Sequence, residues 1–229
     1  MYVNGTTIKD VWVKAINMIL KTGETNIDER GSEVLEINNL FANIDLDDNV
    51  FIENPCYDIP KGSHWKPDKL KIYQEQFLNP DNEKNFVYTY GQRLRGYEMA
   101  IPFKNKYYKA KKIDQIQEVI NKLNNNINTR RAVAVTFNPY LDNENDEIPC
   151  LMMVKFEVKD NKLKTFAVWR SHDIYGAWFA NLIGLWKLAD YVKDNVKKCI
   201  GLDDITVLSM NAHIYKNDIM DAQKIIDSN

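Results

Sequence analysis

The sequence predicts an α+β fold, in which a mixed and mostly antiparallel sheet is packed with helices. Long segments with a helical apolar stripe occur together with strand-like runs. Two of those runs, 151–158 and 163–169, are separated only by a short polar turn. The 229 residues contain no internal repeat and no low-complexity linker. We therefore expect a single domain covering residues 1–229.

The helices are predicted from apolar residues spaced three and four positions apart. In residues 7–21 this stripe consists of Ile8, Val11, Trp12, Ala15, Ile16 and Ile19. Thr6 or Thr7 is placed to cap this helix. The other predicted helices are residues 68–78, 114–125, 181–198 and 218–228.

Strand-like runs separate these helices. Gly23 and Gly31 bracket a polar turn that contains Arg30, and a strand-like run follows it up to residue 44. The other predicted strands are residues 131–137, 151–158, 163–169 and 204–209. Asn161 lies in the expected hairpin between 151–158 and 163–169. Residues 45–67 are rich in proline and aspartate, which predicts a loop.

The composition limits the classes of function. A net charge of -2 gives no overall basic field for DNA or RNA, so a phosphate ligand would need local arginines. No apolar run is long enough to cross a bilayer, and the N-terminus shows no signal-peptide pattern. The 3 cysteines show no CxxC spacing, which indicates reduced thiols and a cytoplasmic protein. No Cys/His spacing is typical of a zinc site, so we expect no metal.

Cys150 follows an acidic, loop-like segment that ends in Ile148-Pro149, and it precedes a predicted strand. Two interpretations are open on this position alone. A free cysteine is among the most buried residue types, which favours a small core residue. A cysteine at the mouth of a pocket is instead a candidate nucleophile.

Arginines lie at the ends of several predicted elements. Arg130 and Arg131 precede one strand, Arg170 and Ser171 follow another, and Arg30 lies in the glycine-bracketed turn. Any one of them is more often solvated or salt-bridged. Together they indicate a phosphate site, because guanidinium groups bind phosphate through paired hydrogen bonds. Such cations would also lower the pKa of a nearby thiol and favour its reactive thiolate.

Two further segments carry polar groups that suit a nucleotide. Asn181 opens an apolar helix, where its amide must find partners, and an amide offers one donor and one acceptor to a pyrimidine edge. Asp173 is either a cap for the turn before that helix or a ligand contact. His213 and Tyr215 alternate along an extended segment, so both can point to one ligand, although a structural histidine is the commoner case.

These clusters, in this order, resemble the thymidylate synthase family. The family pattern is an arginine pair, Pro-Cys before a strand, Arg-Ser-x-Asp, an Asn at a helix start, and His-x-Tyr. The matching residues are Arg130-Arg131, Pro149-Cys150, Arg170-Ser171-His172-Asp173, Asn181 and His213-Ile214-Tyr215. The spacing matches throughout residues 129–217, and YGQRLR at 90–95 resembles a further family element. The DERG turn, WRSHD and SMNAHIY look most like the archaeal branch.

The resemblance implies a thymidylate synthase-like fold and a methyltransferase that converts dUMP to dTMP. Cys150 would add to C6 of dUMP as a thiolate, and a methylene-carrying reduced pterin would supply the carbon. The donor is either 5,10-methylene-tetrahydrofolate or methylene-tetrahydromethanopterin. Family members are homodimers with shared active sites, so a homodimer is implied here too.

Roles for the other residues follow from the same resemblance. The 5′-phosphate would be held by Arg30, Arg170 and Ser171, and by Arg130 and Arg131 of the other subunit. Asn181 would read the uracil edge, His213 and Tyr215 would bind the 3′-hydroxyl, and Asp173 would contact the pterin.

The chain departs from the family pattern around the pterin site. Trp169 replaces the usual Gln before Arg-Ser, and Leu151 stands where a His commonly follows the cysteine. Ala177-Trp178-Phe179-Ala180 replaces Gly-x-Pro-Phe, and the C-terminal DAQKIIDSN lacks the apolar closing tail. The family's glutamate segment, ELLWFL, is absent, and Glu75 in YQEQFL is the best substitute for the general acid/base.

Two other functions remain open at this point. A pyrimidine nucleotide hydroxymethylase on the same fold shares the thiolate addition but ends with water; its cytosine-specific members tend to carry Asp where this chain has Asn181. A non-catalytic nucleotide- or RNA-binding protein would also use the arginines, but the net charge and the absence of an aromatic-basic strip disfavour it.

Overall fold

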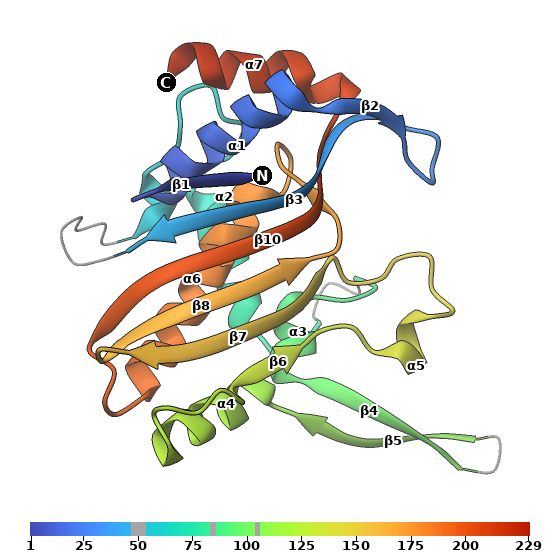
Figure 1. Cartoon of the computed structure of the whole chain (residues 1–229). Helices are drawn as coiled ribbons and strands as arrows, with labels where there is room; N and C mark the ends of the chain where they lie inside the picture. The colour runs from blue at the N-terminus through green and yellow to red at the C-terminus, as the bar shows by residue number, and fades with distance from the viewer. Residues whose placement is uncertain (47–53, 83–85, 104–105) are drawn as a thin grey trace.

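A large mixed sheet organises the chain (Figure 1). The computed structural model describes residues 1–46, 54–82, 86–103 and 106–229. Within them the main sheet has 8 strands, and its central path runs β1-β3-β10-β8-β7-β6, with β2 paired to β3 and β9 to β10. Its strands are β1 (Tyr2–Gly5), β2 (Glu24–Ile27), β3 (Glu33–Asp45), β6 (Val133–Val135), β7 (Leu151–Lys159), β8 (Lys162–Trp169), β9 (His172–Asp173) and β10 (Gly201–Tyr215).

Antiparallel pairs predominate, as predicted. β3 pairs with β10, β7 with β8, β6 with β7 and β2 with β3 in antiparallel fashion, whereas β10 runs parallel to β8 and β9, and β1 runs parallel to β3. The predicted hairpin between β7 and β8 is confirmed: Asp160 and Asn161 have φ of 51° and 62°. Positive φ at both central residues matches the right-handed twist of the strands.

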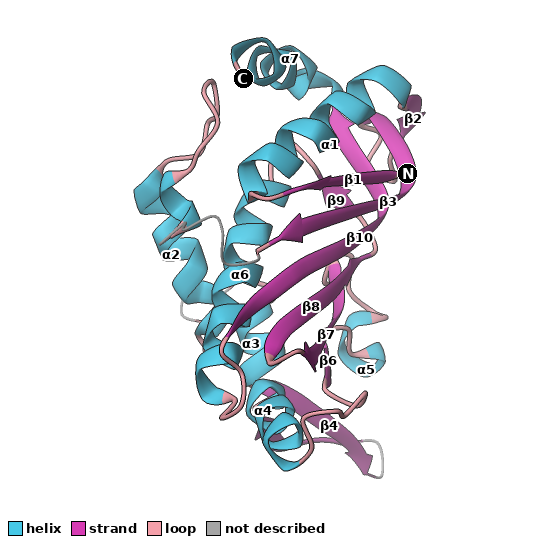
Figure 2. Ribbon diagram, turned by 60° about the vertical axis from the view of Figure 1, so that its left-hand side comes forward, coloured by secondary structure: helices cyan, strands magenta, loops and turns pink. Residues whose placement is uncertain are grey.

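The helices lie mainly on one side of this sheet. They are α1 (Ile8–Thr22), α2 (Pro67–Leu78), α3 (Tyr90–Arg95), α4 (Gln115–Asn125), α5 (Pro139–Asp142), α6 (Trp178–Asn195) and α7 (Ile219–Ser228), with short 3₁₀ turns η1 (Pro55–Tyr57) and η2 (Lys216–Asp218). Figure 2 shows α1, α2 and α6 together on one face. Of the two candidate caps for α1, Thr7 is the one used, and its hydroxyl accepts the Asp10 N–H at 3.0 Å. Among the residues described, no helix has both the length and the apolar character that a membrane span requires.

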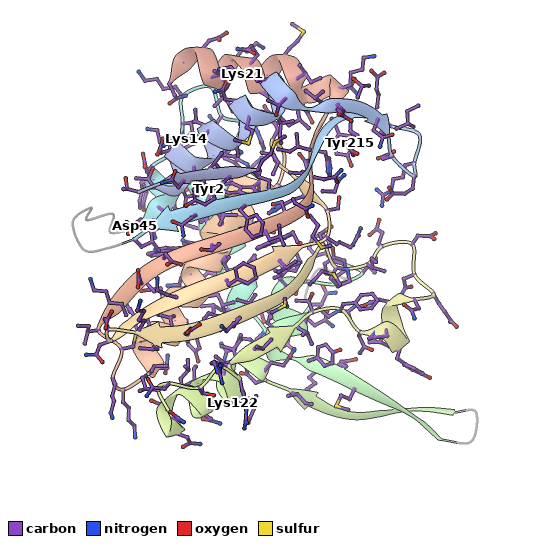
Figure 3. The ribbon with its side chains drawn as sticks, in the orientation of Figure 1. Tyr2, Lys14, Lys21, Asp45, Lys122 and Tyr215 are labelled. Atoms are coloured by element: carbon purple, nitrogen blue, oxygen red, sulfur yellow. The ribbon has the colours of Figure 1, made fainter. Side chains whose placement is uncertain are left out.

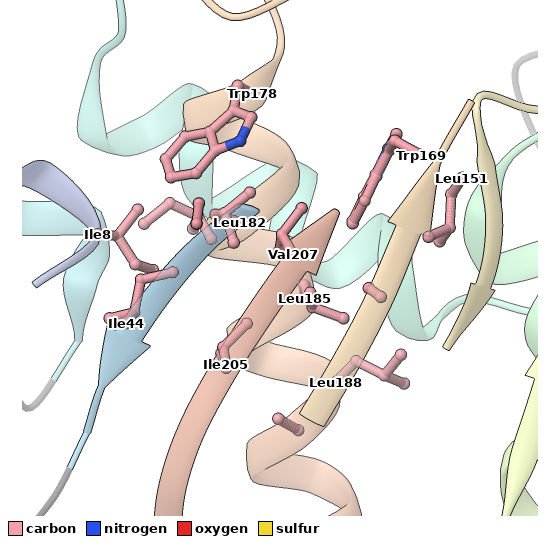
Figure 4. Packing of buried hydrophobic residues seen from close by; sticks show 14 of the residues in the cluster. Ile8, Ile44, Leu151, Trp169, Trp178, Leu182, Leu185, Leu188, Ile205 and Val207 are labelled. Atoms are coloured by element: carbon pink, nitrogen blue, oxygen red, sulfur yellow. The ribbon is translucent and has the colours of Figure 1, made fainter. Parts of the chain in front are cut away.

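The core lies between α6 and the sheet. Leu185 and Leu188 of α6 are buried against the face of the sheet that carries Ile205 and Val207 of β10 (Figure 4). α6 approaches α2 closely at Gly184, where an added Cβ would lie 2.3 Å from the Phe77 ring. This close contact fixes the position of α2, which lines the site described below.

Several elements differ from the sequence-based expectation. β10 runs from 201 to 215 instead of 204 to 209, and β6 is shorter than 131–137. The sequence did not predict β1, α3, α5 or a separate hairpin, which consists of β4 (Tyr97–Phe103) and β5 (Lys106–Ile113). The segment after Gly23 forms β2 before it turns, and all four β2 residues are exposed, so no apolar alternation marked it. Of the predicted loop at 45–67, residues 47–53 lie outside the described residues; residues 54–66 form loop and η1.

Candidate active site

A cavity of about 620 Å³ opens at the end of the sheet where β8 stops and β10 continues. We call it the polar pocket. Tyr215, which lines it from β10, is labelled in Figure 3. Its volume lies in the usual range for small-molecule sites. It brings together eight of the predicted site residues: Arg30, Cys150, Arg170, Ser171, Asp173, Asn181, His213 and Tyr215.

The other three predicted residues do not line this pocket. Glu75 is exposed on α2, whereas its neighbours Tyr73 and Gln74 turn inward. Arg130 and Arg131 are exposed before β6. If these two arginines contribute to a polar pocket, it would therefore have to be the pocket of a second copy of the chain.

Cys150 lies directly before β7 and is half-buried. Burial raises the pKa of its thiol, while Arg170, a hydrogen bond from Tyr88 and the charge of Arg30 act in the opposite direction. The arginines act on the thiol pKa in the predicted direction, but the net pKa is raised, because desolvation of the thiolate outweighs their attraction. Of the charged groups around the thiol, Arg170 and Arg30 are the ones that favour the thiolate.

Arg170 also holds the segment that carries the thiol. Its backbone N–H donates to the carbonyl of Cys150 at 2.8 Å. Its guanidinium donates to the carbonyls of Pro149 at 3.1 Å and Ile148 at 3.0 Å. These bonds occupy part of the guanidinium and leave other N–H groups for a ligand, since a guanidinium has five donors.

Arg30 reaches the mouth of the pocket from the turn between β2 and β3. The Asp28 carboxylate accepts the N–H groups of Arg30 at 3.0 Å and Ser32 at 2.6 Å, which closes the turn. Gly31 has φ of 81°, a conformation in which a side chain would be strained. Arg30 itself is exposed, so it is available to an anion that enters the pocket.

Asn181 sits in the first turns of α6 with both ends of its amide engaged. Its Nδ2 lies 3.0 Å from Nε2 of His172, and its Oδ1 accepts a hydrogen bond from the Tyr73 hydroxyl. His172 in turn places Nδ1 2.9 Å from the hydroxyl of Ser209. Asn181, His172 and Ser209 are all buried.

His213 is oriented by a similar chain of contacts. Its Nδ1 lies 3.1 Å from the side-chain amide oxygen Oδ1 of Asn211, and Nδ2 of Asn211 donates to the Glu36 carboxylate at 2.8 Å. Because an amide oxygen only accepts, Nδ1 carries the proton and Nε2 is left as an acceptor. Burial lowers the pKa of His213, which favours this neutral form. Its ring meets the Tyr215 ring edge to face, with centroids 5.2 Å apart, as the predicted alternation required.

Asp173 both shapes the backbone and faces the pocket. Its Oδ1 accepts the Gly176 N–H at 2.8 Å, so the expected turn cap is present. A Cβ at residue 176 would lie 2.3 Å from the other carboxylate oxygen, which is why glycine fits there. Burial raises the pKa of Asp173, and the Gly176 N–H opposes that shift.

The sequence reasoning missed several residues of the polar pocket. They are Tyr73, Tyr88, Tyr90, His172, Glu36 and Asn211. His172 and Asn211 stand inside the segments already singled out, and the alternation that marked His213 extends back to Asn211. Glu36 lies opposite His213 in the β3–β10 register, a pairing that only the fold reveals.

The arrangement defines a class of protein: a single-domain α+β enzyme-like scaffold with a half-buried thiol, two arginines and fixed amide and imidazole groups around one cavity of small-molecule size. Within the described ranges no cluster of three His, Cys, Asp or Glu side chains could hold a metal ion. Side chains of these types suit a nucleophilic attack on an anionic, hydrogen-bonding substrate.

Comparison with known proteins agrees with this description. The family model described as thymidylate synthase matches residues 61–229. A protein of Methanococcoides burtonii, provisionally named thymidylate synthase, is 40% identical over 225 residues, which cover 98% of this chain and 94% of the relative. Proteins with the same provisional name are 39% identical in Methanothermobacter marburgensis (96% and 95% covered) and 32% identical in Methanocaldococcus jannaschii (91% and 88% covered).

The chain belongs to the thymidylate synthase family. Its similarity to archaeal relatives extends over nearly its whole length, as the resemblance of the WRSHD and SMNAHIY segments predicted. The family implies dUMP and a reduced pterin as substrates.

Proposed function

We propose that the protein is a thymidylate synthase that methylates dUMP to dTMP. The observation that carries this proposal is the meeting of Cys150, Arg30, Arg170, Asn181 and His213 around one cavity. These residues come from distant parts of the chain, and their chemical types suit the phosphate, the base and the sugar of dUMP.

Cys150 is the proposed nucleophile. Its sulfur adds to C6 of the pyrimidine, which makes C5 nucleophilic, and the thiol leaves again when the product forms. Arg170 and Arg30 favour the thiolate, as their effects on the thiol pKa indicate. The Tyr88 hydroxyl, whose own pKa is raised to about 12, remains protonated and donates to the sulfur.

The remaining groups position the nucleotide. Arg30, Arg170 and Ser171 would hold the 5′-phosphate through charge-assisted hydrogen bonds. The Asn181 amide would meet the uracil edge. The Nε2 acceptor of His213 and the Tyr215 hydroxyl would meet the 3′-hydroxyl of the sugar.

The second substrate is a methylene-carrying tetrahydropterin, either the folate or the methanopterin form, which supplies one carbon and a hydride. Asp173 is the proposed pterin contact. Its carboxylate faces the pocket and is fixed at one oxygen by Gly176, so the other oxygen can accept a ring N–H. Glu75 is exposed on α2, so we assign it no proton transfer.

A homodimer is also proposed, and the open face of the sheet supports it. In-register neighbours on five strands form an apolar row across that face: Phe41, Leu208, Val168, Met153 and Val135. Phe41 and Val135 are 39% and 41% exposed, which is unusual for large apolar side chains in such a row. A second copy covering this row would place the exposed Arg130 and Arg131 near a neighbouring subunit. The free cysteines suit a cytoplasmic location.

Product analysis by mass spectrometry tests the proposal. The protein is incubated with dUMP or dCMP, each with methylene-tetrahydrofolate or methylene-tetrahydromethanopterin. A methylated product from dUMP, lost in Cys150→Ala, is the expected outcome and also identifies the donor. A hydroxymethylated product would transfer the function to a hydroxymethylase with the same nucleophile, and turnover by Cys150→Ala would refute the thiolate mechanism.

A further inference from the structure

Tyr73 is the side chain through which α2 lines the polar pocket, and the mechanism above gives it no role. It also lines a neighbouring cavity of about 330 Å³, whereas the Glu75 side chain two residues further along α2 is exposed. Its ring packs against Phe77 with centroids 5.6 Å apart, and Phe77 lies against Gly184 of α6. The contact between the two helices therefore holds the phenol at the pocket.

The Tyr73 hydroxyl lies at one end of the Asn181 amide. It is hydrogen-bonded to Oδ1 of Asn181, and Nδ2 at the other end of the amide lies 3.0 Å from Nε2 of His172. Nδ1 of His172 lies 2.9 Å from the Ser209 hydroxyl, which can donate or accept, so the proton of His172 can occupy either ring nitrogen. The amide can therefore present either its oxygen or an N–H group to Tyr73, and the phenol hydrogen is free to turn toward a ligand.

Addition of the Cys150 thiolate to a uracil ring places negative charge on the O4 atom of the base. The S–C6 bond forms, the electron pair of the C5=C6 bond moves into a C4=C5 bond, and the π pair of the C4=O4 bond passes to O4. Such a charge is stabilised most by donors that already point to the atom where it develops. An N–H of Asn181 can supply one donor to O4, and this oxygen can accept a second.

Tyr73 is suited to supply that second donor. Tyr73 and His172 are the two side chains hydrogen-bonded to the Asn181 amide within the described structure, and of these His172 is only 2% exposed whereas Tyr73 is half-buried. Burial raises the pKa of Tyr73, and the neighbouring Tyr88 and Cys150 act in the same direction. The phenol therefore keeps its proton and can act as a hydrogen-bond donor, not as a base.

We propose that Tyr73 is a catalytic residue whose hydroxyl, together with an N–H of Asn181, donates to O4 and stabilises the negative charge that this oxygen gains when Cys150 adds to C6. The proposal rests on the proposed function, since it places a uracil ring against Asn181. The hydrogen bond to O4 strengthens as the charge develops, so Tyr73 acts on the rate of addition more than on the affinity for dUMP. When the sulfur leaves, the electron pairs return to the ring and O4 is again a neutral carbonyl oxygen.

Exchange of the C5 hydrogen of dUMP in D₂O, without any pterin, tests this role. Addition of the thiolate lets C5 take a deuteron from the solvent, and loss of the C5 proton followed by departure of the sulfur returns dUMP that carries deuterium, which mass spectrometry detects. Tyr73→Phe should slow this exchange about 100- to 1000-fold, the usual effect of removing one donor from a developing oxyanion. Its affinity for dUMP, measured by isothermal titration calorimetry, should fall about fivefold at most, as for a hydrogen bond to a neutral carbonyl. An exchange rate that falls no further than the affinity would overturn the proposal.

Tyr97→Phe is the matched control. Tyr97 on β4 also carries a hydrogen-bonded hydroxyl, which donates to the Phe137 carbonyl at 3.2 Å, but it does not line the polar pocket. Exchange and affinity should both stay at the wild-type values. A slowing as large as that in Tyr73→Phe would contradict a specific role for Tyr73. Cys150→Ala should show no exchange, and exchange that persisted in this variant would remove the thiolate addition on which the proposal depends.

A measurement on dUMP bound to the unaltered protein decides the case if Tyr73→Phe does not fold. Infrared difference spectroscopy with ¹³C at C4 isolates the C4=O4 stretch of the bound nucleotide. A frequency below that of dUMP in water is expected, because two preorganised donors polarise this bond; a frequency at or above the value in water would overturn the proposal. If the wild type neither bound dUMP nor exchanged its C5 hydrogen, the proposed function would fail, whereas a wild-type exchange rate in folded Tyr73→Phe would remove only the role of Tyr73.

Discussion

Replacing Arg170 by Leu should make the Cys150 thiol less reactive. Arg170 exerts the largest of the effects that lower the pKa of this thiol, and its side chain is pinned to the carbonyls of residues 148 and 149. A neighbouring opposite charge typically shifts a pKa by about 1–3 units. Both side chains are only half-buried, so screening by water favours the low end, about one unit.

The direction of the change in Cys150 reactivity follows from the chemistry of thiols. Burial already places the pKa of Cys150 above its ordinary value, so near neutral pH only a small fraction is thiolate. Losing Arg170 raises the pKa further, and one unit reduces the thiolate fraction about tenfold. The rate of alkylation by iodoacetamide, followed for Cys150 by peptide mass spectrometry from pH 6 to pH 9, should therefore fall about tenfold across that range.

Four comparisons make this measurement decisive. Arg170→Lys keeps a positive charge and should lose much less rate, whereas Lys122→Met removes an exposed charge on α4 and should change nothing. In the wild type, Cys150 should react faster than Cys56, whose pKa burial raises to about 11, and added dUMP should protect it. A rate in Arg170→Leu equal to or above that of the wild type would refute the electrostatic role and indicate a loosened Cys150 segment instead.

The remaining predictions concern stability and assembly. Asp142→Ala would leave the buried guanidinium of Arg93 without its partner at 2.6 Å, so calorimetry should show a loss of about 3–5 kcal/mol and a Tm lower by about 10 °C. Gly184→Ala should cost about 1–3 kcal/mol in urea unfolding through its clash with Phe77, despite a better helix propensity, and Phe77→Leu should relieve part of that cost. Leu208→Lys should convert a dimer to monomer in analytical ultracentrifugation; a monomeric wild type would contradict the proposed assembly.

The sequence predicts the fold class and the long apolar helices well, because their signals are local. The stripe of α1 and the turn at Asn161 depend on residues within a few positions of one another. β2 and the β4–β5 hairpin were missed since their pairing partners, not an apolar alternation, define them. The extent of β10 was underestimated because its second half, from Ser209, exchanges apolar for polar side chains on the same face.

The same distinction between local signals and effects of the fold applies to the candidate site. Residues that would contact a ligand, such as Cys150 and Arg170, carry recognisable types at recognisable spacings, and the pocket unites them. The direction in which the arginines act on the thiol pKa is predictable, but the net shift is not, because the sequence does not reveal the depth of burial, which dominates. Glu75 matched a local pattern, but the helical phase of α2 turns Tyr73 inward and leaves Glu75 exposed.

The register of β10 decides which polar side chains of this strand face the pocket. Ser209, Asn211 and His213 alternate along this strand, and His213 lies opposite Glu36 of β3. A slip by one residue would turn all of these side chains to the other face, which would separate Ser209 from His172 and His213 from the pocket. The apolar half of the same strand, where Val207 packs on the α6 side, makes such a slip costly, since it would expose those side chains. The packing of the core therefore fixes the orientation of the polar groups that β10 presents to the pocket.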